Sequence, residues 1–199
     1  MINDKLSITR KLEDFNADER IQVKLLQNHI HFLTGEINNE TIGECIKWIT
    51  YENLDTKQGR ILTLYINSTG GDLYEAFALI DIMKTSTHPI RVIGMGAVMS
   101  AAFLIFASGT KGERYAAPNT SFMCHQFTEN MESKYHDLKA TMKESDLCNA
   151  KMVKILQDAT DLSATKIKNK LLTASDVYLT AKEVVDLGVA DLIIGSVDK

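Results

Sequence analysis

Residues 94–102 read Gly94-Met-Gly-Ala-Val-Met-Ser-Ala-Ala102, a run of small and apolar side chains. The segment before it, Ile90–Ile93, is typical of a strand, and the residues after Ser100 are typical of a helix. A hydroxyl at such a junction lies at a sheet edge, beside the unpaired N–H groups of a helix N-terminus. This position suits a serine nucleophile. A helix cap or a packing residue is the alternative interpretation of Ser100.

Two further residues could complete a catalytic set with Ser100. His125 follows a second strand-like segment, Ser121–Cys124, and Asp176 lies in a loop directly before a helix. A serine hydroxyl attacks well once a base removes its proton, and histidine, with a reference pKa of about 6.5, does this at neutral pH. The other ring nitrogen needs an acceptor. The chain order Ser, His, Asp and the absence of Gly-x-Ser-x-Gly around Ser100 argue against an α/β-hydrolase.

The rest of the chain predicts alternating strands and helices. A strand is expected to end at Gly35, and Asn38 or Asn39 is expected to cap the following helix. Ile61–Ile66 is largely apolar, which predicts a strand buried on both faces. Leu73–Met83 reads as the next helix, closed by the His88-Pro89 pair.

This succession predicts the α/β class with a mostly parallel sheet. Ligands are then expected at the carboxyl ends of the strands, where Gly70, Gly71 and Ser100 all fall.

Glu132–Ala159 contains no Gly or Pro and predicts one long helix. At 1.5 Å per residue it would extend about 40 Å, too far to be covered by one small domain. We therefore expect it to pack on another subunit. A solvated amphipathic helix folded back on its own domain is the alternative. Its apolar positions are Tyr135, Leu138, Met142, Cys148, Met152, Ile155 and Leu156.

Several motifs, in order and at compatible spacing from Phe32 to Ile194, resemble ClpP, the proteolytic subunit family of the Clp protease, including its divergent or phage-type paralogues. The resemblance implies a single ClpP/crotonase-like domain over residues 1–199, built of repeated β-β-α units. It also implies a projecting handle strand and helix over residues 126–160. Residues 1–20 are polar and are expected to form a mobile N-terminal segment. The motifs are Ile66-Asn-Ser-Thr-Gly-Gly71, Gly96-Ala-Val-Met-Ser100, Gly109-Thr-Lys-Gly-Glu-Arg-Tyr-Ala-Ala-Pro-Asn-Thr120, Met123-Cys-His-Gln126 and Asp176-Val-Tyr-Leu-Thr-Ala-Lys-Glu-Val-Val-Asp-Leu-Gly-Val-Ala-Asp191.

The resemblance assigns a role to each candidate site residue. Ser100 is the nucleophile, His125 the general base and then acid, and Asp176 the group that orients the imidazole. The oxyanion hole is formed by the backbone N–H groups of Gly71 and Ala101. Losing one such donor typically costs about 10² to 10³ in rate.

The resemblance also implies partners. ClpP subunits form homo-oligomers of stacked rings, usually heptameric, which enclose polypeptide substrates and bind an AAA+ unfoldase. ATP is used by that unfoldase, so no cofactor and no metal is expected in this chain. Tyr65 and Tyr115 would lie on the docking face of the ring, and Thr63 stands where the family pattern leads us to expect another aromatic residue.

The chain departs from the family pattern at three places. Residues 126–130 read Gln-Phe-Thr-Glu-Asn instead of a Pro and Leu-Gly-Gly type stretch. Thr173-Ala174-Ser175 replaces the Asp-Arg pair that couples ring contacts to the catalytic Asp, and Ala101 stands where Met is usual. These departures concern assembly, its control and substrate alignment more than chemistry.

Two other classes of function remain open. One is a crotonase-fold enzyme that uses the same kind of oxyanion hole on acyl-CoA thioesters, and the other is a catalytically silent structural subunit of a mixed ring. The intact Ser-His-Asp set argues against both. A fluorophosphonate probe discriminates, since only an activated serine is labelled.

Composition excludes several classes of partner. The chain has 199 residues, 45% of them hydrophobic, and a net charge of −4, so it shows no basic footprint for nucleic acid. No apolar run approaches a membrane span, and the N-terminus has no signal-peptide core. Three scattered cysteines suggest neither a zinc site nor a disulfide framework and fit the reducing cytoplasm.

The remaining polar candidates have simpler interpretations. His29 and His31 could share one strand face but lack a third metal ligand nearby, and His88 and His136 are isolated, so structural or surface roles are expected. Asp72 follows the glycine pair and is expected to lie in the acidic first turn of a helix rather than to touch substrate.

Overall fold

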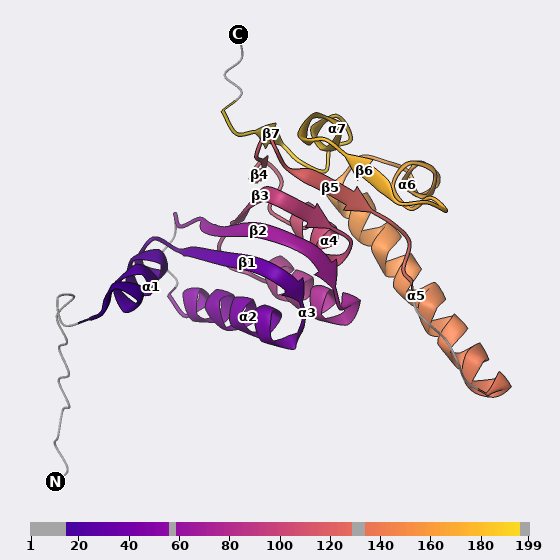
Figure 1. Ribbon diagram of the computed structural model, residues 1–199, viewed down its shortest axis with the longest axis horizontal. Coiled ribbons are helices and arrows are strands. Elements are labelled where there is room, and N and C mark those ends of the chain that lie inside the picture. Colours follow the sequence, from indigo (N-terminus) through magenta and orange to yellow (C-terminus); the bar gives the residue numbers. More distant parts are fainter. Residues whose placement is uncertain (1–14, 56–58, 129–133, 196–199) are drawn as a thin grey trace.

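The computed structural model describes residues 15–55, 59–128 and 134–195, and Figure 1 shows how their elements are arranged. Strands and helices alternate along most of this part of the chain, as the sequence predicted. Within the described ranges, only β4 and β5 follow each other without a helix between them, and the arrangement belongs to the predicted α/β class. In chain order the elements are α1 (Ala17–Gln27), β1 (Ile30–Ile37), α2 (Asn39–Asn53), β2 (Leu62–Gly71), α3 (Leu73–Lys84), β3 (Ile90–Met99), α4 (Ala101–Ala107), β4 (Arg114–Ala116), β5 (Ser121–Cys124), α5 (Tyr135–Ala159), α6 (Ala164–Lys170), β6 (Val177–Leu179), α7 (Ala181–Asp186) and β7 (Leu192–Ile193).

The strands form one mixed sheet with the main order β1-β2-β3-β4-β7, all parallel. β5 pairs in parallel with β3, and β6 pairs antiparallel with β5. Both additional strands therefore extend the sheet at one end of β3. This end is where the candidate site residues lie.

β3 divides the sheet because its two halves have different partners. Its first half, Val92–Gly94, pairs with β4, and its last residues, Ala97–Met99, pair with β5. The strand can change partner between them because Gly96 has φ 66°, which glycine adopts readily. A Cβ at Gly96 would also lie only 2.7 Å from Oδ1 of Asn67, which accepts the Ala97 N–H. The small residues of this run thus allow a fork in the sheet, the point at which β3 changes its partner from β4 to β5.

Helices α2, α3 and α4 pack against one face of the sheet (Figure 1). Along β2 the side chains accordingly alternate: Leu62, Leu64 and Ile66 are fully buried, whereas Thr63 and Tyr65 are half-exposed. The prediction that Ile61–Ile66 is buried on both faces was wrong. A continuous apolar run requires helices on both faces of a sheet, and in the described chain the second face is open.

The N-terminal boundary also differs from the prediction. Residues 1–20 were predicted to be mobile, but α1 begins at Ala17 with a capping box between Asn16 and Glu19. Two reciprocal hydrogen bonds satisfy helix N–H groups there, which stabilises a helix start. The prediction for residues 1–14 concerns residues outside those described. Asn38 caps α2, one of the two caps predicted.

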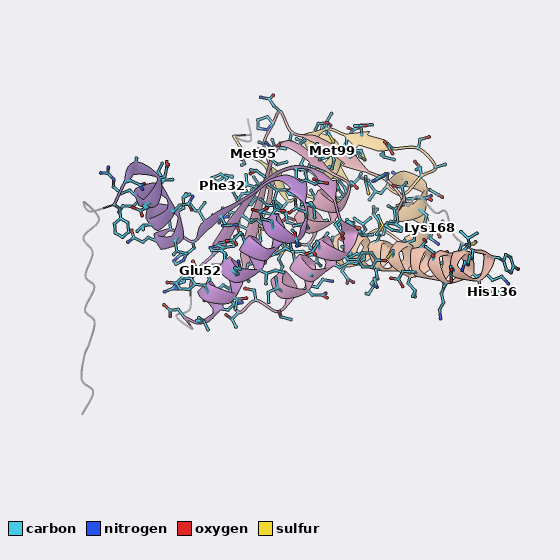
Figure 2. The ribbon with its side chains drawn as sticks, turned by 60° about the horizontal axis from the view of Figure 1, so that its bottom comes forward. Phe32, Glu52, Met95, Met99, His136 and Lys168 are labelled. Atoms are coloured by element: carbon cyan, nitrogen blue, oxygen red, sulfur yellow. The ribbon has the colours of Figure 1, made fainter. Side chains whose placement is uncertain are left out.

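The long helix predicted from Glu132 is present as α5, which spans about 37 Å at 1.5 Å per residue. Its buried residues begin only at Cys148, and the half before that projects away from the body of the protein (Figure 1). Figure 2 shows His136 at the outer end of this helix. Residues 126–128 form no strand in the described chain, because they pair with no neighbouring strand. The rest of the predicted handle strand, residues 129–133, lies outside the described residues.

Among the helices of the described ranges, none is both long and apolar enough to cross a membrane.

Candidate active site

Ser100 lies between the end of β3 and the first residue of α4, as the sequence predicted. Its backbone has φ 53° and ψ −123°, a conformation that costs a non-glycine residue about 1 to 3 kcal/mol. Two backbone bonds hold it: Ser100 N–H donates to Met123 O at 2.9 Å, and Phe103 N–H donates to Ser100 O at 3.0 Å. The Ser100 side chain makes no cap bond to α4. Ser100 therefore occupies the N-cap position of α4, as the alternative interpretation had it, but its hydroxyl does not cap the helix.

Close packing maintains this strained turn. All seven residues of α4 are buried, and Phe103 and Phe106 pack against Phe122 of β5. On the other side, Gly70 approaches so closely that a Cβ there would lie 2.7 Å from Ser100 Cβ and 2.9 Å from Met99 O. Gly70 has φ +103°, so glycine is required for conformation and for space.

His125 is brought to Ser100 by the fork in the sheet. β5 runs beside the last residues of β3, and His125 directly follows β5, so the two side chains meet although 25 residues separate them. Ser100 Oγ and His125 Nε2 are 2.7 Å apart. With the proton on Nδ1, Nε2 accepts the hydroxyl hydrogen. This geometry is suited to removal of that proton by the imidazole.

Cys124, the neighbour of His125, faces the core as strand alternation predicts. Burial raises the pKa of this thiol to about 12. The thiol therefore stays protonated at neutral pH and is unsuitable as a nucleophile.

Asp176 lies directly before β6, the strand that pairs with β5. Its Oδ1 is 3.5 Å from His125 Nδ1, within the range of an ion pair but long for a hydrogen bond. The Asp176 side chain is 51% exposed, whereas that of His125 is 22% exposed. The three predicted side chains therefore meet, with Asp176 the least tightly held.

Gly71 and Ala101 lie beside Ser100 on two different elements. Gly71, the last residue of β2, has φ +147°, and a Cβ there would collide with the carbonyl oxygen of Ile37. Ala101 is the first residue of α4, so its N–H has no intrahelical partner. Both residues line a cavity of about 60 Å³ that also contains Ser100 and His125. Both predicted oxyanion donors are thus adjacent to the serine.

The same cavity includes residues that the sequence analysis did not assign to the site. Its apolar wall is formed by Leu73 from α3, Met152 from α5, and Phe127 from the segment after β5. Met152 had been identified only as an apolar position of the long helix, because that pattern does not show which other element the helix covers. Gln126 and Thr128 complete the lining.

The other polar candidates have structural partners. His29 Nδ1 lies 2.8 Å from Glu52 Oε2, and His88 Nε2 donates to Asp55 O at 2.9 Å. His31 stacks on Trp48, and burial lowers the pKa of its imidazole. These histidines lie outside the cavity that contains Ser100.

His136 contacts the ring of Tyr135 at the outer end of α5. Asp72 caps α3 by accepting the N–H groups of Tyr74 and Glu75, as expected for a helix first turn. Neither residue lines the cavity beside Ser100.

The residues expected on a docking face share the open face of the sheet. Tyr65 stacks on Phe32, which is 42% exposed and is labelled in Figure 2. Arg91 lies over the ring of Tyr115. Thr63 is half-exposed two residues before Tyr65 on the same strand.

Comparison with known proteins agrees with this geometry. The family described as "Clp protease" matches residues 14–197. A relative from Treponema denticola, named "ATP-dependent Clp protease proteolytic subunit 2", is 29% identical over 179 residues, which cover 89% of this chain and 88% of the relative. The matched region contains every candidate residue described above.

Proposed function

Since this chain belongs to the Clp protease family, we propose that it is a serine endopeptidase that cleaves unfolded polypeptides or peptides through an acyl-enzyme. Family membership supports a protease role. The contact of 2.7 Å between Ser100 Oγ and His125 Nε2, at a strained strand-to-helix turn, is the observation that supports the serine mechanism most directly.

In the proposed mechanism, His125 Nε2 takes the hydroxyl proton as Ser100 Oγ attacks the scissile carbonyl carbon. The developing oxyanion accepts hydrogen bonds from the N–H groups of Gly71 and Ala101. Protonated His125 then gives its proton to the leaving amine, and the acyl-enzyme remains. Water, activated by His125, hydrolyses this ester and restores Ser100. Asp176 holds the imidazole in the required tautomer throughout.

The chemistry uses only protein groups, so we propose that the reaction itself needs no cofactor. The relative is named as an ATP-dependent subunit, and we propose that any ATP requirement of this chain also belongs to a separate AAA+ unfoldase. The open sheet face with Phe32, Tyr65 and Tyr115 is the proposed docking surface.

We further propose that the chain assembles into stacked heptameric rings through the outer half of α5. In that half Tyr135, Met142 and Leu147 are 65%, 59% and 46% exposed. Tyr135 and Met142, seven residues apart, lie on one face of the helix, and exposed apolar side chains on a projecting helix favour contact with a partner.

Labelling with a fluorophosphonate probe tests the proposed function. The purified protein should be labelled on Ser100, and Ser100→Ala should lose labelling and lower peptide hydrolysis by a factor of about 10⁴ or more. Ser108→Ala is the matched control, because Ser108 Oγ donates to Leu104 O at the far end of the same helix. A labelled serine other than Ser100 would contradict the assignment. Absence of labelling in the assembled protein would favour a silent structural subunit.

A further inference from the structure

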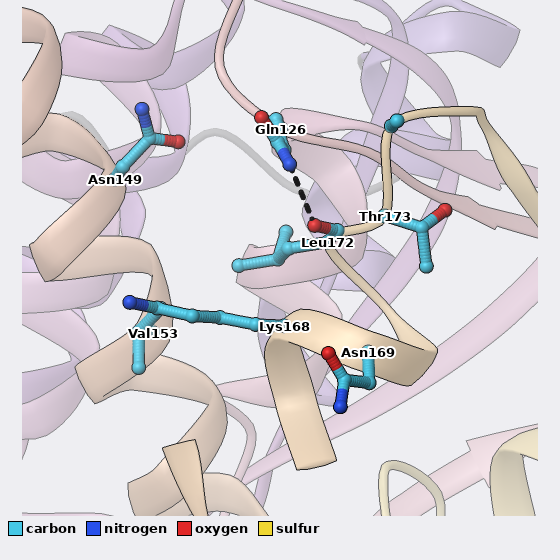
Figure 3. Close-up of a pocket in the computed structure, with 8 residues that line it drawn as sticks. Gln126, Asn149, Val153, Lys168, Asn169, Leu172 and Thr173 are labelled. Atoms are coloured by element: carbon cyan, nitrogen blue, oxygen red, sulfur yellow. Dashed lines mark hydrogen bonds between the residues drawn. The ribbon is translucent and has the colours of Figure 1, made fainter. Parts of the chain in front are cut away.

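A second cavity of about 580 Å³ lies beside the candidate active site, between α5, α6 and the loop that leads to Asp176. Figure 3 shows Gln126 at its edge, with its side-chain amide directed at the backbone of Leu172. Gln126 Nε2 donates to Leu172 O at 2.8 Å. Gln126 therefore connects the segment after His125 to the segment before Asp176.

This bond has a counterpart on the other side of His125. Cys124, the residue before His125, pairs with Val177, the residue after Asp176, in the β5–β6 ladder. The three residues 124–126 are thus tied at both ends to the loop over residues 172–177. His125 lies between the two ties on one chain segment, and Asp176 lies between them on the other.

The loop between the ties has little else to hold it. Its first residue, Leu172, is 4% exposed and so gives the Gln126 amide a fixed acceptor. Ala174, Ser175 and Asp176 are exposed to solvent, and Thr173 is half-buried, with its Oγ donating to the nearby Ser175 O. With Asp176 itself half-exposed, packing cannot fix the position of its carboxylate. The two ties must do so.

We propose that Gln126 is a positioning residue, which sets the distance between Asp176 and His125 through its hydrogen bond to Leu172 O. This inference rests on the proposed serine mechanism. Loss of the bond leaves the loop held only through β6, so the Asp176 carboxylate moves away from Nδ1 of His125. The imidazole then samples the wrong tautomer and orientation more often.

A double-mutant cycle with Asp176 tests this inference. Gln126→Glu keeps the shape of the side chain, but its carboxylate cannot donate to a carbonyl. We expect it to lower kcat by about 10-fold to 10²-fold, with a smaller change in KM, since small misplacement of a catalytic group has costs of this size. Gln126→Ala should lower kcat similarly. In an Asp176→Asn background, either change should lower kcat by less than about threefold, because residues that act as a unit are non-additive.

Lys168→Ala is the matched control, because Lys168 lines the same cavity from α6 and should leave kcat unchanged. Circular dichroism and light scattering establish that each variant is folded and assembled. If the reduction in kcat of the double variant equals the product of the reductions caused by Gln126→Glu and Asp176→Asn alone, Gln126 does not act through Asp176, and the inference is wrong. A fall of less than twofold in both single variants, with Ser100-dependent hydrolysis intact, also overturns it. If Ser100→Ala itself leaves hydrolysis unchanged, the proposed function fails, and the inference fails with it.

Discussion

The turn at Ser100 and the loop at Asp176 supply two parts of one candidate site, but they are held in different ways. Ser100 is followed by a completely buried helix and abuts Gly70 without room for a Cβ. Asp176 is half-exposed and lies in a short loop tied at its two ends. The proposed nucleophile is therefore positioned by the core of the protein, whereas the proposed orienting carboxylate depends on a few polar contacts.

The same contrast separates the two halves of α5. From Cys148 onward the helix contributes to the core and lines the cavity beside Ser100 through Met152. Before Cys148 it projects with large apolar side chains exposed. In this protein, tight packing accompanies the proposed nucleophile, and weak packing accompanies the parts that we propose respond to assembly.

Replacing the Asp176 carboxylate is the strongest test of the contrast between the tightly packed Ser100 and the loosely held Asp176. If Asp176 orients His125, Asp176→Asn should keep the fold and lower kcat by roughly 10⁴, because the amide favours the wrong tautomer. Steady-state kinetics on the assembled variant measure this. Asp186→Asn is a suitable control, since Asp186 is an exposed residue that pairs with Lys182. A loss below about tenfold would move the role to another acceptor.

The outer half of α5 should be needed for assembly rather than for folding. Replacing Leu138 and Met142 by Asp would bury unpaired charge at the proposed ring contact, at a cost of several kcal/mol per site. Light scattering should show loss of stacked rings in this double variant. Ala140→Asp adds a charge about half a helical turn away from Leu138 and should leave assembly intact.

The nature of this contact can be examined with salt. Because Ala174 and Ser175 replace a charged pair, the contact should depend on apolar packing and should resist moderate salt, which screens exposed charges over about 8 to 10 Å. Rings that remain stacked in the double Asp variant would exclude the helix as the stacking element. Dissociation of the unmutated protein by moderate salt would indicate that ion pairs maintain it.

The close approach at the nucleophile gives the smallest of these effects. Gly70→Ala should lower kcat by about 10², because the new Cβ displaces Ser100 from its position against His125. Gly112 provides a matched control. It also has positive φ, +89°, but its Cβ would meet nothing within 4 Å. Gly112→Ala has a similar conformational cost but introduces no contact with the site. Equal losses of activity in Gly70→Ala and Gly112→Ala would therefore contradict displacement of Ser100 as the cause.

Most of the fold class and the three side chains of the candidate triad could be predicted from the sequence. The strand-to-helix junction at Ser100 is a local property, and alternation of apolar patterns indicates strands and helices over short windows. Resemblance over ordered motifs then related His125 and Asp176 to that serine. The cap at Asn38 and the long helix were likewise readable, because caps and helical periods depend on neighbours in the chain.

What the sequence could not specify depended on contacts between distant segments. The apolar pattern of β2 is the same whether helices cover one face of the sheet or both, so its burial was predicted incorrectly. Met152 lines the cavity beside Ser100 because the inner half of α5 packs back on the body of the protein, and Gln126 reaches Leu172 because the loop after α6 returns to His125. By itself, the sequence determined most of the elements and the candidate site side chains, since these follow from local patterns and ordered motifs. The tertiary structure decided which face is open, which carboxylate is loosely held and what holds it, because those properties depend on residues that meet only after folding.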